Sequence, residues 1–179
     1  MNLQHLLEDV ISLENSYPSR REDGDIFATK MGLNSLQGSP RSVGSFFCDD
    51  NSLTTLEGGP DKVRGSFFVT GNKLTSLKGS PQVVQGNFCC DGNELTSLVG
   101  ITKTIGAELH IDEGIPLAGL PLIRIGGDVT VYSKGKKIVM RELSGIINRY
   151  INKGREGVVD LQNELLAHGY DKEAEFEPL

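Results

Sequence analysis

The chain has 179 residues and a mass of 19.4 kDa, enough for one domain with a substantial hydrophobic core. Its formal charge of −6, from 18 basic and 24 acidic residues, argues against a nucleic-acid binder that works through a bulk positive field. Glycine is frequent, at 22 residues against 7 prolines, which predicts many tight turns rather than disorder. No apolar run reaches the roughly 18 residues of a membrane span, and residues 1–12 lack the basic n-region of a signal peptide. We therefore expect a soluble, cytoplasmic protein with no membrane partner.

Residues 1–23 are predicted to form an N-terminal helical cap. Their apolar residues follow the i, i+3, i+4 spacing of one helix face, and Pro18 stops the pattern. The residues on this face are Leu3, Leu6, Leu7, Val10 and Ile11. Such a helix would close the end of the repeat region that follows.

Residues 24–133 form about six copies of a 20–21-residue repeat, which we interpret as the coils of a solenoid. Three strong copies begin at Gly44, Gly65 and Gly86 and share the pattern G-x-F-x-[CV]-x-x-N-x-L-x-x-L-x-G-x-P-x-x-V, with Thr102 in place of proline in the third. A degenerate copy precedes them, and weaker copies follow, centred on residues 109–111 and 129–131. No coil can bury its apolar face alone, so the coils must stack to form a continuous core.

Each strong copy contains an alternating apolar segment that predicts a short strand with inward side chains, followed by a turn. We expect the asparagine at this turn to satisfy buried backbone groups of the next coil. Met31 and Gly114 replace it in outer copies. The three instances are Phe46-x-Cys48-x-x-Asn51-x-Leu53, Phe67-x-Val69-x-x-Asn72-x-Leu74 and Phe88-x-Cys90-x-x-Asn93-x-Leu95.

This motif resembles the leucine-rich repeat. The L-T-x-L-x-G-x-P-x-x-V segment after it resembles the short bacterial type of that repeat, and the whole unit is similar to small repeat proteins of bacteriophage and bacterial genomes. The resemblance covers residues 24–132. It implies a recognition scaffold like those of phage or mobile-element accessory factors, several of which bind and inhibit a host enzyme or toxin. The resemblance thus implies a host-takeover or anti-defence role in the host cytoplasm.

Residues 134–170 are predicted to form a C-terminal helical cap. One helix is expected from Ile138 to Ile151, before Gly154, and a second from Val158 to Leu166, before Gly169. The alternative is that this pair forms a surface for a partner or a dimer. Residues 171–179 are predicted to be a frayed acidic tail. The predicted fold class is therefore α+β: a short leucine-rich-repeat-type β-solenoid with an N-terminal helical cap and a C-terminal helical pair.

One column of residues is predicted to point out of the concave sheet, because it lies between the two inward positions of each strand. Aromatic residues in a row, edged by polar ones, have the composition of a binding hot spot with a polar rim. The alternative is that a cap helix, the segment before Gly24 or a second copy buries the column. The column is Phe27, Phe47, Phe68, Cys89, His110 and Thr130, and the flanking residues that we assign to the site are Asp49, Thr70, Asp91 and Asp112.

Cys89 and His110 are neighbours in this column, with Asp91 and Asp112 two residues along the same face. A thiol, an imidazole and a carboxylate could form a nucleophilic dyad or a metal site. No oxyanion donor or second metal-ligand motif accompanies them, and an open face excludes water poorly. We therefore predict no catalysis, no metal and no cofactor.

The other cysteines are predicted to be free. Cys48 and Cys90 occupy the same inward slot two rungs apart, which places their Cα atoms about 9–10 Å from each other. A disulfide needs less than about 7 Å. Cys89 and Cys90 are adjacent and point to opposite faces. Free thiols indicate a reducing compartment.

A basic cluster in residues 134–155 is open to two interpretations. It could bind an acidic partner or a phosphate backbone, or it could be a solvated helix face, which we favour. Nucleic acid is therefore an unlikely partner. The members of the cluster are Lys134, Lys136, Lys137, Arg141, Arg149, Lys153 and Arg155.

The function predicted from these patterns is non-catalytic recognition of a host protein on the concave face. Phe27, Phe47 and Phe68 would be the anchors. The alternatives are a homodimer or larger assembly closed by the phenylalanine column, and weak nucleic-acid binding through residues 134–155.

Overall fold

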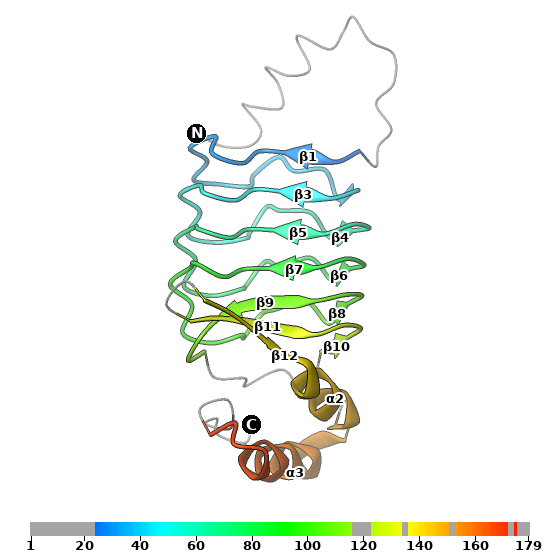
Figure 1. The fold of residues 1–179 in the computed structure, drawn as a ribbon. Coiled ribbons are helices and arrows are strands. Elements are labelled where there is room, and N and C mark those ends of the chain that lie inside the picture. The colour runs from blue at the N-terminus through cyan, green and yellow to red at the C-terminus, as the bar shows by residue number, and fades with distance from the viewer. Residues whose placement is uncertain (1–23, 116–122, 134–135, 151–152, 172–173, 175–179) are drawn as a thin grey trace, which may run out of the picture.

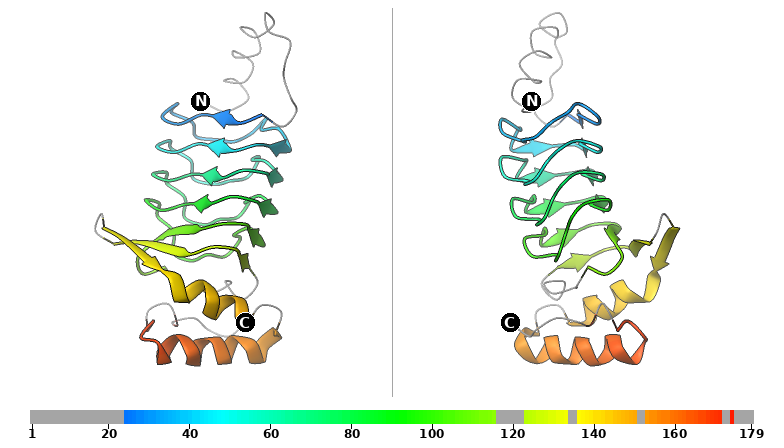
Figure 2. Two further views of the ribbon diagram at one scale, coloured as in Figure 1. Left: turned by 45° about the vertical axis from the view of Figure 1, so that its right-hand side comes forward. Right: turned by 90° about the vertical axis from the view of Figure 1, so that its left-hand side faces the viewer.

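The computed structural model describes residues 24–115, 123–133, 136–150, 153–171 and 174. Within these ranges the chain winds into a β-solenoid of about five turns, followed by two helices (Figure 1). The predicted N-terminal helical cap, residues 1–23, lies outside the described residues. The stack is straight in Figures 1 and 2, so its long sheet is flat along the axis rather than concave.

Each turn contributes one strand to each of two parallel sheets. Register is kept from coil to coil, so that Phe47 lies opposite both Phe27 and Phe68. The longer sheet contains β1 (Ile26–Phe27), β3 (Phe46–Phe47), β5 (Phe67–Phe68), β7 (Phe88–Cys89), β9 (Leu109–Asp112) and β11 (Val129–Ser133), and ends in the antiparallel β12 (Lys136–Met140). The shorter sheet contains β2 (Ser42–Val43), β4 (Lys62–Val63), β6 (Val83–Val84), β8 (Thr104–Ile105) and β10 (Arg124–Ile125).

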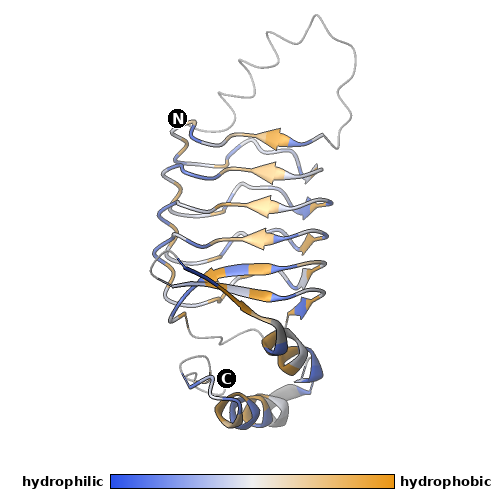
Figure 3. Ribbon diagram, in the orientation of Figure 1, coloured by the Kyte–Doolittle hydropathy of each residue, from blue (hydrophilic) through white to orange (hydrophobic). Residues whose placement is uncertain are grey.

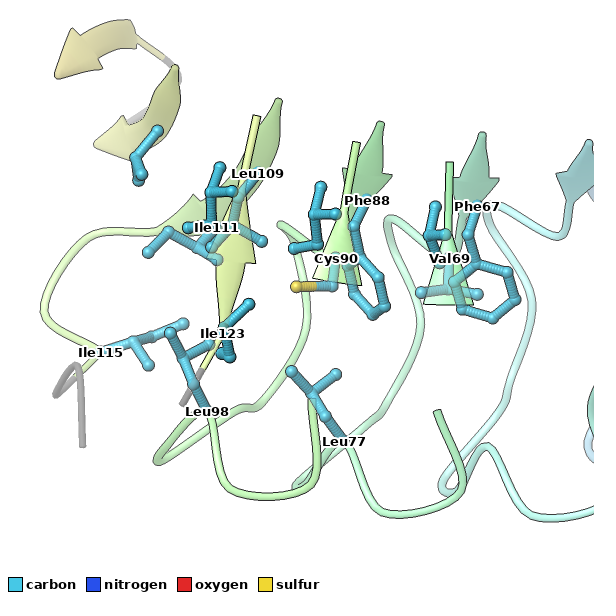
Figure 4. Close-up of a cluster of buried hydrophobic side chains, with 14 of the residues drawn as sticks. Phe67, Val69, Leu77, Phe88, Cys90, Leu98, Leu109, Ile111, Ile115 and Ile123 are labelled. Carbon is cyan, nitrogen blue, oxygen red and sulfur yellow. The ribbon is translucent and has the colours of Figure 1, made fainter. Parts of the chain in front are cut away.

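The core runs through the middle of the stack, as the alternation of the repeat predicts. Phe46, Cys48 and Leu53 are fully buried, and so are their equivalents Phe67 and Phe88 in the next coils. Figure 4 shows Phe67 and Phe88 at equivalent positions of neighbouring coils, both pointing into the core. Ring centroids of successive inward phenylalanines lie 5.5 and 5.4 Å apart. Because each coil places the same residue type at the same depth, burial is continuous along the axis.

The asparagine ladder (Asn51, Asn72 and Asn93) ties each coil to its neighbour. The Oδ1 atom of Asn72 accepts the N–H of Leu53 at 3.1 Å, and its Nδ2 donates to the carbonyls of Cys48 and Val69, both at 3.0 Å. The partner coil is therefore the preceding one, not the following one that the sequence had suggested. The reason is that each asparagine side chain points toward the preceding coil, whose backbone N–H and C=O groups face it.

Glycines lie where adjacent coils approach most closely. At Gly79, which has φ +88°, an added Cβ would lie 2.5 Å from the backbone nitrogen of Glu57. At Gly106 it would lie 2.1 Å from the carbonyl oxygen of Gln85. Only glycine avoids both contacts, since it has no Cβ and tolerates positive φ. Close approach at the corners of each coil accounts for much of the glycine excess.

The start of the C-terminal region differs from the prediction of a helix over 138–151. Residues 136–140 form β12, which pairs with β11 so that Ile138 lies opposite Val131. Ile138 and Val139 are β-branched and suit a strand, and β12 satisfies the backbone edge that β11 would otherwise leave unpaired. The predicted helix therefore begins only after this strand.

Two helices complete the chain, as predicted. They are α2 (Arg141–Tyr150) and α3 (Gly154–Ala167), and the second ends before Gly169, which has φ +75°. Ala174 is buried, and its carbonyl accepts a bond from Gln162 at 3.2 Å, so this part of the acidic tail is packed rather than frayed. No helix among the described residues has the length and apolarity needed to cross a membrane.

Candidate functional site

The predicted column lies on the outward side of the longer sheet, here called the outer face. Its first three members form the Phe ladder (Phe27, Phe47 and Phe68), whose ring centroids are 4.9 and 5.0 Å apart with the rings within 3° and 9° of parallel. The ladder follows directly from strand register, because β1, β3 and β5 place these residues opposite one another. Figure 3 shows the apolar strands side by side along this sheet.

Phe27, at the N-terminal end of the Phe ladder, is its most exposed member. Phe68 and Phe47 are partly buried, each between neighbouring coils, whereas the Phe27 side chain is 70% exposed. One ring face of Phe27 has no counterpart in the ladder, because β1 is the first strand of the sheet. Among the described residues, the ladder therefore presents a row of ring edges and, at Phe27, one ring face without a stacked partner.

The β11–β12 hairpin covers the other half of the column. β12 crosses in front of β9 and β11 in Figure 1, and Figure 2 shows it standing out from the sheet. Beneath it Cys89 is only 4% exposed and Thr130 is 0% exposed. The sequence left open what covers the column; for this half the cover is the chain's own hairpin. Its signal in the sequence was the β-branched pair Ile138–Val139.

The hairpin half of the column contains polar side chains, although it is mostly shielded from solvent. The Thr130 hydroxyl has no hydrogen-bond partner although it is fully buried. His110 is held instead by Glu108, whose Oε2 lies 2.8 Å from the imidazole Nε2, and its ring packs 5.9 Å from that of Tyr132. The hydrogen bond from His110 lowers the pKa of Glu108.

The flanking residues assigned to the site form one continuous polar row. The Asp49 carboxylate accepts the N–H of Thr70 at 2.9 Å, and the Thr70 hydroxyl donates to Asp91 at 3.3 Å. Asp112 accepts the N–H groups of Gly92 and Asn93 in the coil before it, at 2.9 and 3.2 Å. These side chains therefore hold adjacent coils together as well as edging the column.

The carboxylates of this row are crowded and partly buried. Burial raises the pKa of Asp49, and Asp50 adds to the increase. Burial likewise raises the pKa of Asp91, helped by the charge of Asp112. The outer face thus carries negative charge that the protein itself compensates only in part.

The surroundings of Cys89 disfavour the thiolate that a thiolate–imidazole pair requires. Burial, followed by the charges of Asp91, Asp49 and Glu108, raises the pKa of the Cys89 thiol to about 12. A thiol with that pKa stays protonated at neutral pH and is a poor nucleophile. No group of three or more potential metal ligands is found in the part of the chain that the structure describes.

All three thiols are free, as predicted. Cys48 and Cys90 lie fully buried on the inward side, and Figure 4 shows the sulfur of Cys90 pointing into the core. Burial raises the pKa of Cys48 to about 12 and that of Cys90 well above its ordinary value. They act as small apolar core residues.

The described members of the predicted basic cluster are divided among β12, α2, α3 and the segment between the two helices. Lys136 and Lys137 lie on β12. Arg149 pairs with Glu164 of α3, and the ammonium of Lys153 lies 4.6 Å from the centre of the Tyr150 ring. Lys134 lies outside the described residues. The arrangement of the described members is that of a helix pair and a hairpin with separate partners.

Comparison with known proteins adds no relative: no protein-family model, no curated protein and no solved structure matches this chain.

Proposed function

We propose that this solenoid is a non-catalytic protein-recognition module. Its binding site would be the open half of the outer face, which is the half built on β1, β3 and β5. The observation that carries the proposal is the Phe ladder, three stacked rings of which two are partly buried and the last, Phe27, is exposed. A row of aromatic side chains on a protein surface is unusual, because exposure of each ring to water costs free energy. A partner that covers the row would recover that free energy.

The surroundings of the ladder support a protein partner. Asp49, Thr70 and Asp91 run along one side of it as a polar row whose members are already hydrogen-bonded to one another or to backbone. An aromatic centre with a polar rim is the usual anatomy of a protein interface. Side chains fixed before binding also lose little entropy when the complex forms.

A finer proposal concerns the class of protein. The repeat pattern G-x-F-x-[CV]-x-x-N-x-L supports a leucine-rich-repeat-type solenoid, and the similarity of the repeat unit to small repeat proteins of phage and bacterial genomes supports an accessory factor of phage type. On this proposal the protein works stoichiometrically, by occupying a host enzyme or toxin and inhibiting it. Such inhibition needs tight binding and no chemistry.

The test is capture of a partner from a host lysate with three forms of the protein. Wild type is compared with Phe47→Asp/Phe68→Asp and with the matched control Val99→Asp, which alters an exposed apolar residue, 61% exposed, outside the Phe ladder. Circular dichroism and thermal melting confirm that all three are folded. We expect wild type and control to retain one stoichiometric protein and the double variant to lose it.

Light scattering of the same samples separates the two uses of the ladder. If nothing is captured and the double variant changes from dimer to monomer, the ladder closes a homodimer and the foreign-partner proposal fails. If the control loses the partner as well, the contact is not specific to the outer face.

A further inference from the structure

The strand β12 has one free edge and lies apart from the Phe ladder. It is the last strand of the seven-stranded sheet, and no strand of the described residues pairs with its other side. Ile138 and Val139 point to opposite faces, yet they are 45% and 42% exposed. β12 is paired with β11 alone, whereas β11 is also paired with β9, and Figure 2 shows β12 standing out from the stack. A free strand edge with apolar residues on both faces is a template for another strand.

The backbone groups of β11 indicate which groups of β12 are free. The carbonyls of Asp128 and Tyr132 accept bonds from residues 109 and 113, on the side of β9. Backbone groups of successive strand residues point to opposite edges. Those of Val131 therefore point toward β12.

The same alternation extends to β12. Ile138 is the register partner of Val131, so the N–H and C=O groups of Ile138 point back toward β11. The N–H and C=O groups of Lys137 and Val139 therefore face the free edge. A strand added at this edge would bond to residues 137 and 139 and leave Ile138 in a non-hydrogen-bonded position.

We propose that the occupant of this edge is β12 of a second copy, paired antiparallel about a two-fold axis at Ile138. In this register Lys136 lies opposite Met140 of the second copy, and Lys137 lies opposite Val139. All five residues of β12 are paired, and no lysine faces a lysine. The two Ile138 side chains meet at the axis, where Cα atoms of a non-hydrogen-bonded pair are about 4.5 Å apart.

Neighbouring registers are worse. An axis at Lys137 sets Lys137 opposite its own copy, and like charges directly opposed destabilise a strand pair. An axis at Val139 runs the ladder into α2, which begins at residue 141, and leaves three paired residues. The charge pattern of the strand therefore selects one register.

The proposed dimer goes beyond the recognition function and does not depend on it. A two-fold axis between antiparallel edge strands is perpendicular to the local sheet, so the same face of β12 points to the same side in both copies. The dimer would carry two Phe ladders, and a partner with two sites could bind both with the gain of an intramolecular second contact.

A cysteine at the axis tests the register directly. In Ile138→Cys, the Cα atoms of the two new cysteines lie within the separation of about 4.4–6.8 Å that a disulfide needs. In the matched control Val139→Cys, the two thiols are diagonal neighbours, about 7–8 Å apart. The native Cys48, Cys89 and Cys90 are buried and do not compete. We expect mild oxidation to cross-link Ile138→Cys at least tenfold faster than Val139→Cys.

Sedimentation velocity tests the association without a new thiol. We expect reversible wild-type dimers at concentrations up to about 1 mM, where even a weak contact of about −4 kcal/mol is populated. Ile138→Lys should weaken the dimer at least tenfold, because it opposes two lysines at the axis. Val159→Lys, which changes a residue of α3 with the same 45% exposure, should not.

Three outcomes would overturn the proposal. They are equal cross-linking of the two cysteine variants, a wild type that is monomeric at every concentration, and a dimer insensitive to Ile138→Lys. The Phe47→Asp/Phe68→Asp variant keeps the two proposals apart: loss of partner capture with unchanged Ile138→Cys cross-linking supports both. Loss of cross-linking in that background would assign the dimer to the Phe ladder instead.

Discussion

The two halves of the outer face differ in solvent exposure and in polarity. The apolar half is the more exposed one, which is the reverse of most protein surfaces. The half built on β1, β3 and β5 presents the apolar Phe ladder to solvent. The half built on β7, β9 and β11 carries Cys89, His110 and Thr130 and lies beneath the hairpin. Apolar groups normally lie under cover and polar groups in water. The open half is therefore the one that gains most from a partner.

The coils beneath the two halves are also stabilised differently. The asparagine ladder repeats the same buried bonds beneath the Phe ladder and ends at Asn93. In the following coil Gly114 stands at the asparagine position, and there the hairpin and the helices close the stack. A solenoid needs such closure because its last coil has no successor to pack on. Variants in the two halves should thus respond in different ways.

Removal of one rung of the asparagine ladder should have the largest effect. Asn72→Ala leaves the buried N–H of Leu53 and the carbonyls of Cys48 and Val69 without their partner. We expect the free energy of unfolding, measured with urea, to fall by about 3 kcal/mol. Asn163→Ala, an exposed change on α3, should stay within about 0.5 kcal/mol of wild type. A loss below about 1 kcal/mol would mean that the ladder contributes little to the open half.

The hairpin should protect Cys89 from alkylation. With a pKa of about 12 and 4% exposure, Cys89 should react with iodoacetamide at pH 7.5 at least ~100-fold more slowly than in the unfolded chain. Tyr132→Ala, which thins the cover, should raise the native rate about tenfold. Cys48, buried in a coil outside the hairpin, is the internal control and should not change. Equal acceleration of both thiols, read by mass spectrometry, would indicate global opening instead.

Replacement of the unpartnered hydroxyl under the hairpin should stabilise the protein. Thr130→Val keeps the shape of the side chain and removes a buried polar group that has no hydrogen-bond partner. We expect a gain of about 1 kcal/mol in the free energy of unfolding. The matched control is Thr102→Val, because that buried threonine donates to the carbonyl of Thr104 at 3.4 Å. A gain at both positions would show only that burial of an extra methyl group is favourable, whether or not the hydroxyl has a partner.

The smallest effect concerns the carboxylate row beside the Phe ladder. Burial raises the pKa of Asp49 above its ordinary value, so ionisation of this group opposes folding. Its contribution is most favourable when it is protonated and declines as pH rises through the raised pKa. Asp49→Asn keeps an acceptor for the N–H of Thr70 and should be a few tenths of a kcal/mol more stable at pH 7. The gain should fade toward about pH 4, where Asp49 itself is protonated. Thermal melts across this range, with the exposed Asp160→Asn as control, would refute the assignment if the gain did not vary with pH.

The solenoid could be predicted from the sequence because each coil is specified by a local pattern. Alternation at Phe46 and Cys48 fixes which side chains point inward, and identical spacing in the next coils fixes the register. The position of the Phe ladder follows from the same alternation and spacing, so it could be predicted without knowledge of distant contacts. The direction of the asparagine bonds did need it, because both neighbouring coils offer backbone groups.

The hairpin could not be predicted in the same way. Ile138 and Met140 continue a helical spacing into α2, and the strand they form depends on pairing with β11. That pairing then decides which half of the column is covered, so an error over five residues leaves the exposure of Cys89 and Thr130 undetermined. The local pattern identified the residues of the column, whereas a tertiary contact divided them into an exposed group and a buried group.

The close approach of backbone at each glycine corner has a consequence for how such a molecule can change. A Cβ at Gly106 has no room, so point substitution at the corners is costly. A whole coil can nevertheless be inserted or removed, because every coil meets its neighbours through the same contacts. Duplication of residues 65–85 would lengthen the molecule by one rung of about 4.8 Å and add one phenylalanine to the row. The length of the Phe ladder can therefore change by duplication of a coil, whereas substitution of single residues leaves it fixed.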